Sequence, residues 1–161
     1  MAVYTTAGST LAIATGSNAN TRPADATAFA ALTWTLVGEV ENLGTFGDTA
    51  NLVTFLSVAD NRVRKRKGAR NAGTMEIVCG HDPLDAGQIA MLAASNSQLI
   101  HNFRVVENDR ADSNDTNSIS YFTGLMMSGA KNLGGTDDIT KRNFTVEIDS
   151  AIVYVPATVV P

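Results

Sequence analysis

The chain has 161 residues, of which 44% are apolar and 17% charged, with a net charge of −4 and one cysteine, Cys79. This length suits one domain with a hydrophobic core, and a single cysteine excludes a fold held together by intrachain disulfides. The acidic balance argues against a protein that grips nucleic acid over its whole surface, because such binding needs clustered cations.

The chain starts without a cationic segment followed by an apolar run, and no apolar stretch approaches the roughly 20 residues of a membrane helix. The sequence therefore predicts neither a secretory signal nor a membrane span. We expect the protein to be made in the cytoplasm and to stay soluble or assemble there.

Residues 1–31 are rich in Ala, Thr, Ser and Asn and hold a single cation, Arg22. Residues 3–5 and 11–13 could each add a short strand, and residues 16–27 are typical of a loop. Such a segment holds little core of its own. We therefore predict an N-terminal arm that is either mobile or ordered by a neighbour.

Alternation of apolar and polar residues begins at Thr33, and it places Trp34, Leu36 and Val40 on the apolar face of a half-buried strand. A second strand is predicted over 51–58 and a third over 74–79. The third has Met75, Ile77 and Cys79 on one side.

Between the last two strands lies a basic segment, 59–73, which is predicted to be a long exposed loop. Six of the twelve cations of the chain fall within nine positions of it: Arg62, Arg64, Lys65, Arg66, Lys67 and Arg70. Such a charge run is usually a solvated segment without core-forming side chains.

A helix is predicted over 83–95, with Asp82 as N-cap, Pro83 at the first helical position and Asp85 in the first turn. Its bulky face would cover a sheet, and its small face would allow another element to approach closely. The bulky face comprises Leu84, Ile89, Met91 and Leu92, and the small face comprises Ala86, Gly87, Ala90, Ala93 and Ala94.

Strands are predicted next at 99–106 and 118–127, with polar loops at 108–117 and 131–140. The last strand alternates from Phe144 to Tyr154, and Glu147 and Asp149 lie on its polar face. The apolar tail 156–161 should be extended, either frayed or docked on a neighbour. Residues 32–155 are therefore predicted to form a mainly β domain, an antiparallel sandwich or barrel with one flanking helix.

The residues needed for catalysis or metal binding are few. Cys79 and His81 would point the same way on a strand, but zinc needs three or four ligands and His101 is the only other histidine. The aspartates at 109, 112 and 115 have the wrong offsets for an EF-hand. The sequence supports no enzyme, and we expect neither a cofactor nor a metal.

Several motifs together resemble the tail tube (major tail) proteins of bacteriophages with long flexible tails. The resemblance begins with Val37-Gly38-Glu39-Val40 and Leu43-Gly44-Thr45-Phe46-Gly47, and it continues through the glycine pair Gly68 and Gly73. The segments Thr74-Met75-Glu76-Ile77, Asp82-Pro83-Leu84-Asp85-Ala86-Gly87-Gln88 and His101-Asn102-Phe103-Arg104-Val105-Val106 follow in the same order. It covers about Trp34 to Asp149 and departs from the family at Leu52 and Asn71.

The resemblance implies hexameric rings, with the sheets of the subunits joined into a continuous inner β-barrel. The rings would stack into a virion tail tube that holds the tape-measure protein, conducts DNA without specific binding, and meets terminator and tip proteins at its ends. Equivalent tubes occur in gene transfer agents and tailocins. Pairing sheet edges between subunits would also remove the aggregation risk of free edges.

Three expectations remain open at this level. The basic loop 59–73 is a candidate ring-to-ring connector, because the rest of the chain is acidic. Glu147 and Asp149 either face the lumen or lie on an outer solvated surface. The alternative to a tube subunit is a free-standing ligand-binding β-sandwich, although such modules usually present exposed aromatic side chains.

Overall fold

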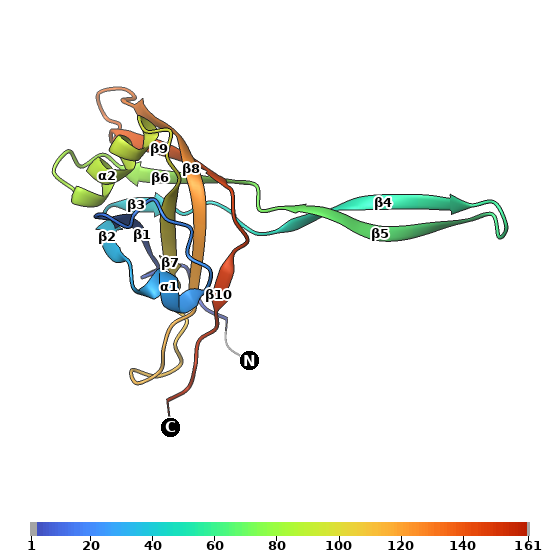
Figure 1. Cartoon of the computed structure of the whole chain (residues 1–161). Helices are drawn as coiled ribbons and strands as arrows, with labels where there is room; N and C mark the ends of the chain where they lie inside the picture. Colours follow the sequence, from blue (N-terminus) through green and yellow to red (C-terminus); the bar gives the residue numbers. More distant parts are fainter. Residues whose placement is uncertain (1–2, 161) are drawn as a thin grey trace.

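The computed structural model describes residues 3–160 and contains two sheets and two helices (Figure 1). The strands are β1 Thr10–Thr15, β2 Thr33–Val37, β3 Val40–Asn42, β4 Thr49–Ser57, β5 Arg62–Asn71, β6 Thr74–Gly80, β7 His101–Val106, β8 Ile119–Asn132, β9 Lys141–Ile148 and β10 Val153–Val155. The helices are α1 Ala26–Ala30 and α2 Ala86–Ser95. Within the described chain, neither helix is long and apolar enough to span a membrane.

The larger sheet is antiparallel, with the order β2-β1-β7-β8-β9-β6-β3, and β10 pairs with the first part of β8. Its two end strands, β2 and β3, are separated in the chain only by Gly38 and Glu39, so the sheet curls until its ends approach. The side-chain amide of Gln88 joins the connection between β2 and β3 to the end of β6 by donating to the carbonyls of Gly38 at 3.1 Å and Gly80 at 2.8 Å. The mainly β, barrel-like antiparallel fold predicted from the sequence is confirmed.

The core lies inside the curled sheet, and most strands bury every second side chain in it. The predicted face of β6 is confirmed, since Met75, Ile77 and Cys79 are fully buried. In β9 the inward residues are Phe144 and Val146. Along these strands the buried residues alternate with polar residues that lie on the outer face, as expected for a sheet with one buried face.

The predicted N-terminal arm is instead part of the barrel. Strand β1 lies between β2 and β7, and Leu11 and Ile13 are buried in the core. The following segment covers the outer face of the sheet, where Phe29 of α1 stacks on Tyr121 with ring centroids 5.2 Å apart. The short strand considered for residues 11–13 is thus present, but its place inside the barrel was not predicted, because Ala12 and Ala14 are also buried and the alternation of a half-exposed strand is absent.

Two predicted strands are interrupted. The strand expected from Thr33 through Val40 breaks at Glu39, whose φ of 54° is left-handed. Val37 enters the core, whereas Leu36 is exposed and Trp34 is half-buried on the outer face beside Tyr121. The last predicted strand ends at Ile148 and resumes as β10.

Helix α2 begins at Ala86 rather than at residue 83. Asp85 is its N-cap and accepts from the backbone N–H of Gln88 at 2.8 Å, while Asp82 instead accepts from Leu84 N–H in the preceding turn. The predicted bulky face is partly wrong, because Leu84 and Ile89 are exposed. The buried side comprises Gly87, Gln88, Met91 and Ala94.

We expect Gly87→Ala to destabilise the protein, although alanine is the better helix former by about 1 kcal/mol. A Cβ at this position would lie 2.1 Å from the carbonyl oxygen of Leu36, so α2 would have to move away from β2. Overpacking of this kind typically costs about 1–3 kcal/mol. Urea unfolding of Gly87→Ala tests this. Ala93→Gly, on the exposed side of α2, is the control, because it measures the difference in helix propensity between alanine and glycine without a change in packing. A more stable Gly87→Ala protein would contradict the close packing.

The C-terminal tail is hydrogen-bonded to the loop 108–117 of its own chain. Thr158 N–H donates to Thr116 Oγ1 at 3.0 Å, and Val160 N–H donates to Asp115 at 3.1 Å. Pro161 lies outside the described residues. The loop 108–117 thereby gains an ordered partner, which the sequence did not indicate.

Candidate assembly surfaces

Strands β4 and β5 form a separate two-stranded antiparallel sheet, which extends away from the rest of the molecule (Figure 1). The predicted basic loop 59–73 is therefore wrong as secondary structure, because Arg62–Asn71 is a strand paired with β4 from Ser57 back to Thr49. With nine residues in β4, the hairpin is about 30 Å long, since a strand rises about 3.3 Å per residue.

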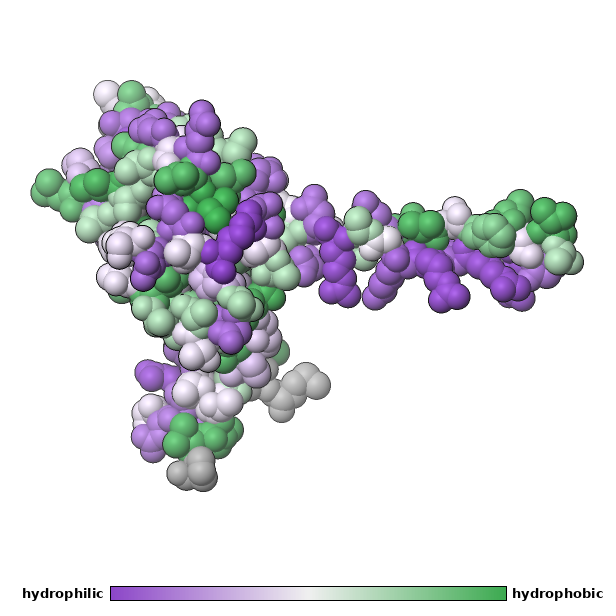
Figure 2. Space-filling model, viewed as in Figure 1, coloured by the Kyte–Doolittle hydropathy of each residue, from purple (hydrophilic) through white to green (hydrophobic). Residues whose placement is uncertain are grey.

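The two strands of the hairpin differ in chemistry. Strand β4 contains no charged residue, and its Leu52 and Phe55 are 64% and 65% exposed. Strand β5 carries all six cations of the segment. Figure 2 shows the result as a hydrophobic edge and a hydrophilic edge along the projecting part. Within residues 3–160 these apolar side chains remain largely exposed, and exposed apolar patches of this kind are typical of contact surfaces.

The register distributes the cations over both faces of the hairpin. Phe55 faces Arg64, and Val53 faces Arg66. Because side chains alternate along a strand, Arg62 lies on the same face as these arginines, whereas Lys65 and Lys67 lie on the other. Arg70 lies nearer the base, opposite Ala50. Each face therefore offers one apolar row and one cationic row.

The charge of the molecule is divided between the hairpin and the remainder. Residues 49–71 carry six cations against one carboxylate, Asp60, for a net charge of +5. The remainder has six cations against fifteen carboxylates, for a net charge of −9. A hairpin of one copy is thus electrostatically complementary to the body of another.

Glu147 and Asp149, the predicted lumen-facing residues, have different positions. Glu147 lies on the outer face of β9, opposite the buried Val146 and Ile148, and its side chain accepts a hydrogen bond from Thr74. Asp149 follows the end of β9 and pairs with Arg22. The structure therefore places only Glu147 on the regular sheet surface.

The outer face around Glu147 is a polar sheet surface formed by β6 and β9. Glu76 faces Thr145 across the strand pair, and Thr74 faces Glu147. Thr74 and Glu76 are exposed, and Thr145 and Glu147 are half-buried. Small polar and acidic side chains thus cover this face, and Glu76 adds a carboxylate that the sequence pattern does not mark as a site residue.

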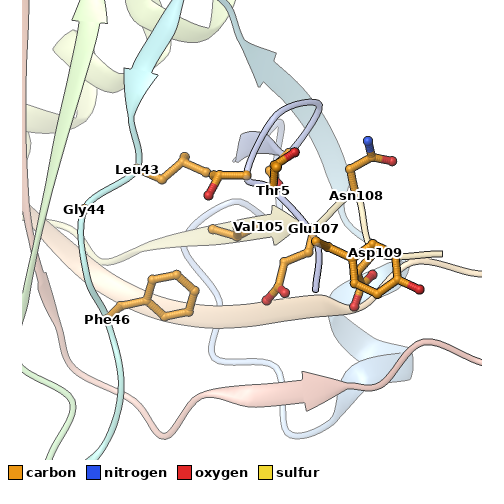
Figure 3. A pocket seen from close by; sticks show the side chains of 11 residues that line it. Thr5, Leu43, Gly44, Phe46, Val105, Glu107, Asn108 and Asp109 are labelled. Atoms are coloured by element: carbon orange, nitrogen blue, oxygen red, sulfur yellow. The ribbon is translucent and has the colours of Figure 1, made fainter. Parts of the chain in front are cut away.

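A pocket of about 210 Å³ opens between the segment that follows β3 and the end of β7 (Figure 3). Leu43, Phe46 and Val105 form its apolar wall. Glu107 and Asp109 lie at its polar side. Asp109 accepts from Ser118 N–H at 2.7 Å, and its hydrogen bonds to Ser118 lower its pKa from the ordinary value. No such bond occupies the side chain of Glu107 in the described residues.

The Cys79–His81 pair does not form a reactive centre. Cys79 is fully buried in the core, whereas His81 lies beyond the end of β6, where its N–H donates to Thr140 at 2.9 Å. Burial raises the pKa of Cys79 to about 11, and the negative charge of Asp85 adds to this. Within residues 3–160, no three His, Cys, Asp or Glu side chains group as metal ligands.

We therefore expect Cys79 to react slowly with a thiol reagent at pH 8 in the folded protein. An ordinary cysteine has a pKa of about 8.5, so a pKa near 11 leaves ~200-fold less thiolate, and burial hinders the reagent further. Unfolding in urea should release this protection completely. Labelling of the native protein as fast as that of the urea-unfolded chain would contradict the burial.

Two solved structures share this architecture. A sheath/tube terminator of the extracellular contractile injection system PVC, in the extended state, superposes with a TM-score of 0.68 and 7% sequence identity, over 96% of this chain and 98% of that one. The SPP1 tail tube superposes with a TM-score of 0.60 and 13% identity, over 92% and 76% of the two chains. No family model and no curated protein matches the sequence. The chain thus has the fold of tail tube proteins, as the resemblance implied.

Proposed function

We propose that the protein is the structural subunit of a phage-type tail tube, in which six copies form a ring and the rings stack. In this proposal the lumen holds the tape-measure protein and later conducts DNA into the host cell. Terminator and tip proteins bind the ends of the tube. The tube assembles in the host cytoplasm and becomes part of a virion tail, or of the equivalent tail of a gene transfer agent.

The observation that carries the proposal is the hairpin β4–β5 on a tail tube fold. An element about 30 Å long that exposes Leu52, Phe55 and Val63 would be a liability on a monomer. Exposed apolar edges favour association, and proteins usually cover them. Contact with a neighbouring subunit would cover this edge.

The six cations of β5 give the hairpin the role of ring-to-ring connector. Each exposed ion pair contributes only about 0.2–1 kcal/mol, but a six-fold ring would repeat the contact at each interface. The net charge of −9 outside the hairpin supplies carboxylates on every neighbour. Apolar contacts of β4 would add stabilisation that does not depend on salt.

The polar face of β6 and β9 is the surface that we assign to the lumen. It presents Glu76 and Glu147 among small polar side chains, so it would repel DNA phosphates and leave the passage free of strong binding. Asp149 would lie at the margin of this surface beside Arg22. In a map of an assembled tube, both glutamates facing the outer wall would refute this assignment.

Electron microscopy of the concentrated protein tests the proposal directly. We expect six-fold rings, or tubes of stacked rings, with a central pore. Isolated subunits at high concentration, with no contact between sheet edges or through the hairpin, would favour the free-standing ligand-binding sandwich instead.

A tube terminator is a second candidate, because the PVC terminator superposes over nearly its whole length. A terminator would form single rings and bind the end of an existing tube. Rings that never elongate across a range of concentrations would favour this role, whereas open-ended stacking would favour the tube subunit.

A further inference from the structure

The pocket beside Phe46 and the tip of the hairpin carry complementary apolar and charged groups. The tip carries Val58, which is 98% exposed, in the turn between β4 and β5. Arg62 begins β5 next to that turn. No ion pair within the described chain engages Arg62, whereas Arg64 pairs with Asp60 at 2.8 Å. The tip therefore offers Val58 as its most exposed apolar side chain and Arg62 as a cation outside these ion pairs.

The pocket offers the matching groups. Figure 3 shows Leu43, Val105 and Phe46 along one side of the pocket, with the Glu107 side chain on the other side. Phe46 packs on Phe122 with ring centroids 5.7 Å apart, so the apolar wall continues the core and is rigidly held. Since Ser118 binds Asp109, Glu107 is the carboxylate of the pocket that remains available for a cation.

The hairpin of the same chain cannot fill this pocket. Phe46 lies only three residues before Thr49, where β4 begins, so the pocket adjoins the base of the hairpin. The tip lies about 30 Å away along the strands. Only a second copy can bring a tip to this position.

We infer that the hairpin tip of one copy docks in this pocket of the next copy, with Val58 against Leu43 and Phe46 and with Arg62 paired to Glu107. This inference rests on the proposed function and names the acceptor surface of its connector. The two surfaces differ, so the contact is head-to-tail. Repeating it generates a ring or an open stack rather than a closed dimer.

Disulfide cross-linking of the full chain tests the contact, because the one native cysteine is buried. A Val58→Cys, Thr5→Cys double variant places one thiol at the tip and one at the rim of the pocket. We expect a ladder of cross-linked oligomers under mild oxidation, and no ladder from either single variant. A Val58→Cys, Thr136→Cys variant, with its second thiol in the remote loop between β8 and β9, should also give no ladder.

Charge reversal of the ion pair between Arg62 and Glu107 is the second test of the contact. On the cross-linking background, Arg62→Glu or Glu107→Arg alone should lower the ladder yield about fivefold, the upper end for an exposed ion pair, and their combination should restore it. Absence of a ladder, or no rescue by the combination, would overturn the docking. A ladder from a Thr5→Cys, Val159→Cys variant would also overturn it, because the C-terminal tail would then be the occupant of the pocket. Tubes seen by microscopy without these cross-links would leave the proposed function standing.

Discussion

An Arg64→Glu, Arg66→Glu double variant is expected to fold normally and to fail to form tubes. Both side chains lie on one face of the hairpin, opposite Phe55 and Val53, and neither contributes to the buried core. The double reversal changes the net charge of the hairpin from +5 to +1, from the sequence composition, so its attraction to the acidic body of a neighbour is largely lost. Electron microscopy should show monomers or isolated rings, while the urea midpoint stays within the small range typical of surface changes.

The conservative variant Arg64→Lys, Arg66→Lys is the matched control, because it preserves the charge while changing the same two positions. It should form tubes. Wild-type tubes should also shorten at 1 M salt, where the screening length falls to about 3 Å. Tubes of the Glu variant with wild-type length and salt resistance would show that the hairpin is not an electrostatic connector.

A Phe122→Ala variant is expected to lose about 3–5 kcal/mol of unfolding free energy, the usual cost of removing a fully buried phenylalanine. Phe122 is completely buried; it stacks on Phe103, with ring centroids 5.5 Å apart, and packs against the tilted ring of Phe46. Domains of this kind are stable by about 5–15 kcal/mol in total, so the loss would be a large fraction of it. Urea unfolding followed by tryptophan fluorescence measures this change.

The matched control is Phe55→Ala in the hairpin. Phe55 is 65% exposed, so its removal should change stability by less than about 0.5 kcal/mol while reducing assembly. If Phe55→Ala destabilised the monomer as much as Phe122→Ala, the hairpin would have to pack against the body in solution. The pair thus separates folding from association with one type of side chain.

The sequence by itself determined the buried faces of β6 and β9 and the approximate extent of α2. The alternation in β6 and β9 was sufficient, because burial on a single face imposes a period of two on the side chains. The start of α2 was placed too early because Asp82 and Asp85 both suit an N-cap, and only the contacts of Asp85 with Gln88 and Gly38 select between them.

For the candidate site, the sequence located the six cations and their excess over local carboxylates, but it assigned them to a loop. A run of arginines and lysines has no apolar period, so nothing within it indicates a strand. The partner strand β4 decides its conformation through the pairing from Ser57 to Thr49. That pairing also creates the separation into an apolar edge and a cationic edge, on which the assembly proposals depend.

The tertiary structure alone decided the place of the N-terminal residues and of the pocket. Strand β1 pairs Leu11 with Val105, 94 positions further along the chain, and burial on both faces removes the periodic signal that marks a half-exposed strand. The pocket likewise joins segments near residues 4, 44 and 107. Local patterns record which face of a strand is buried, whereas the partners that bury it are set by contacts between distant segments.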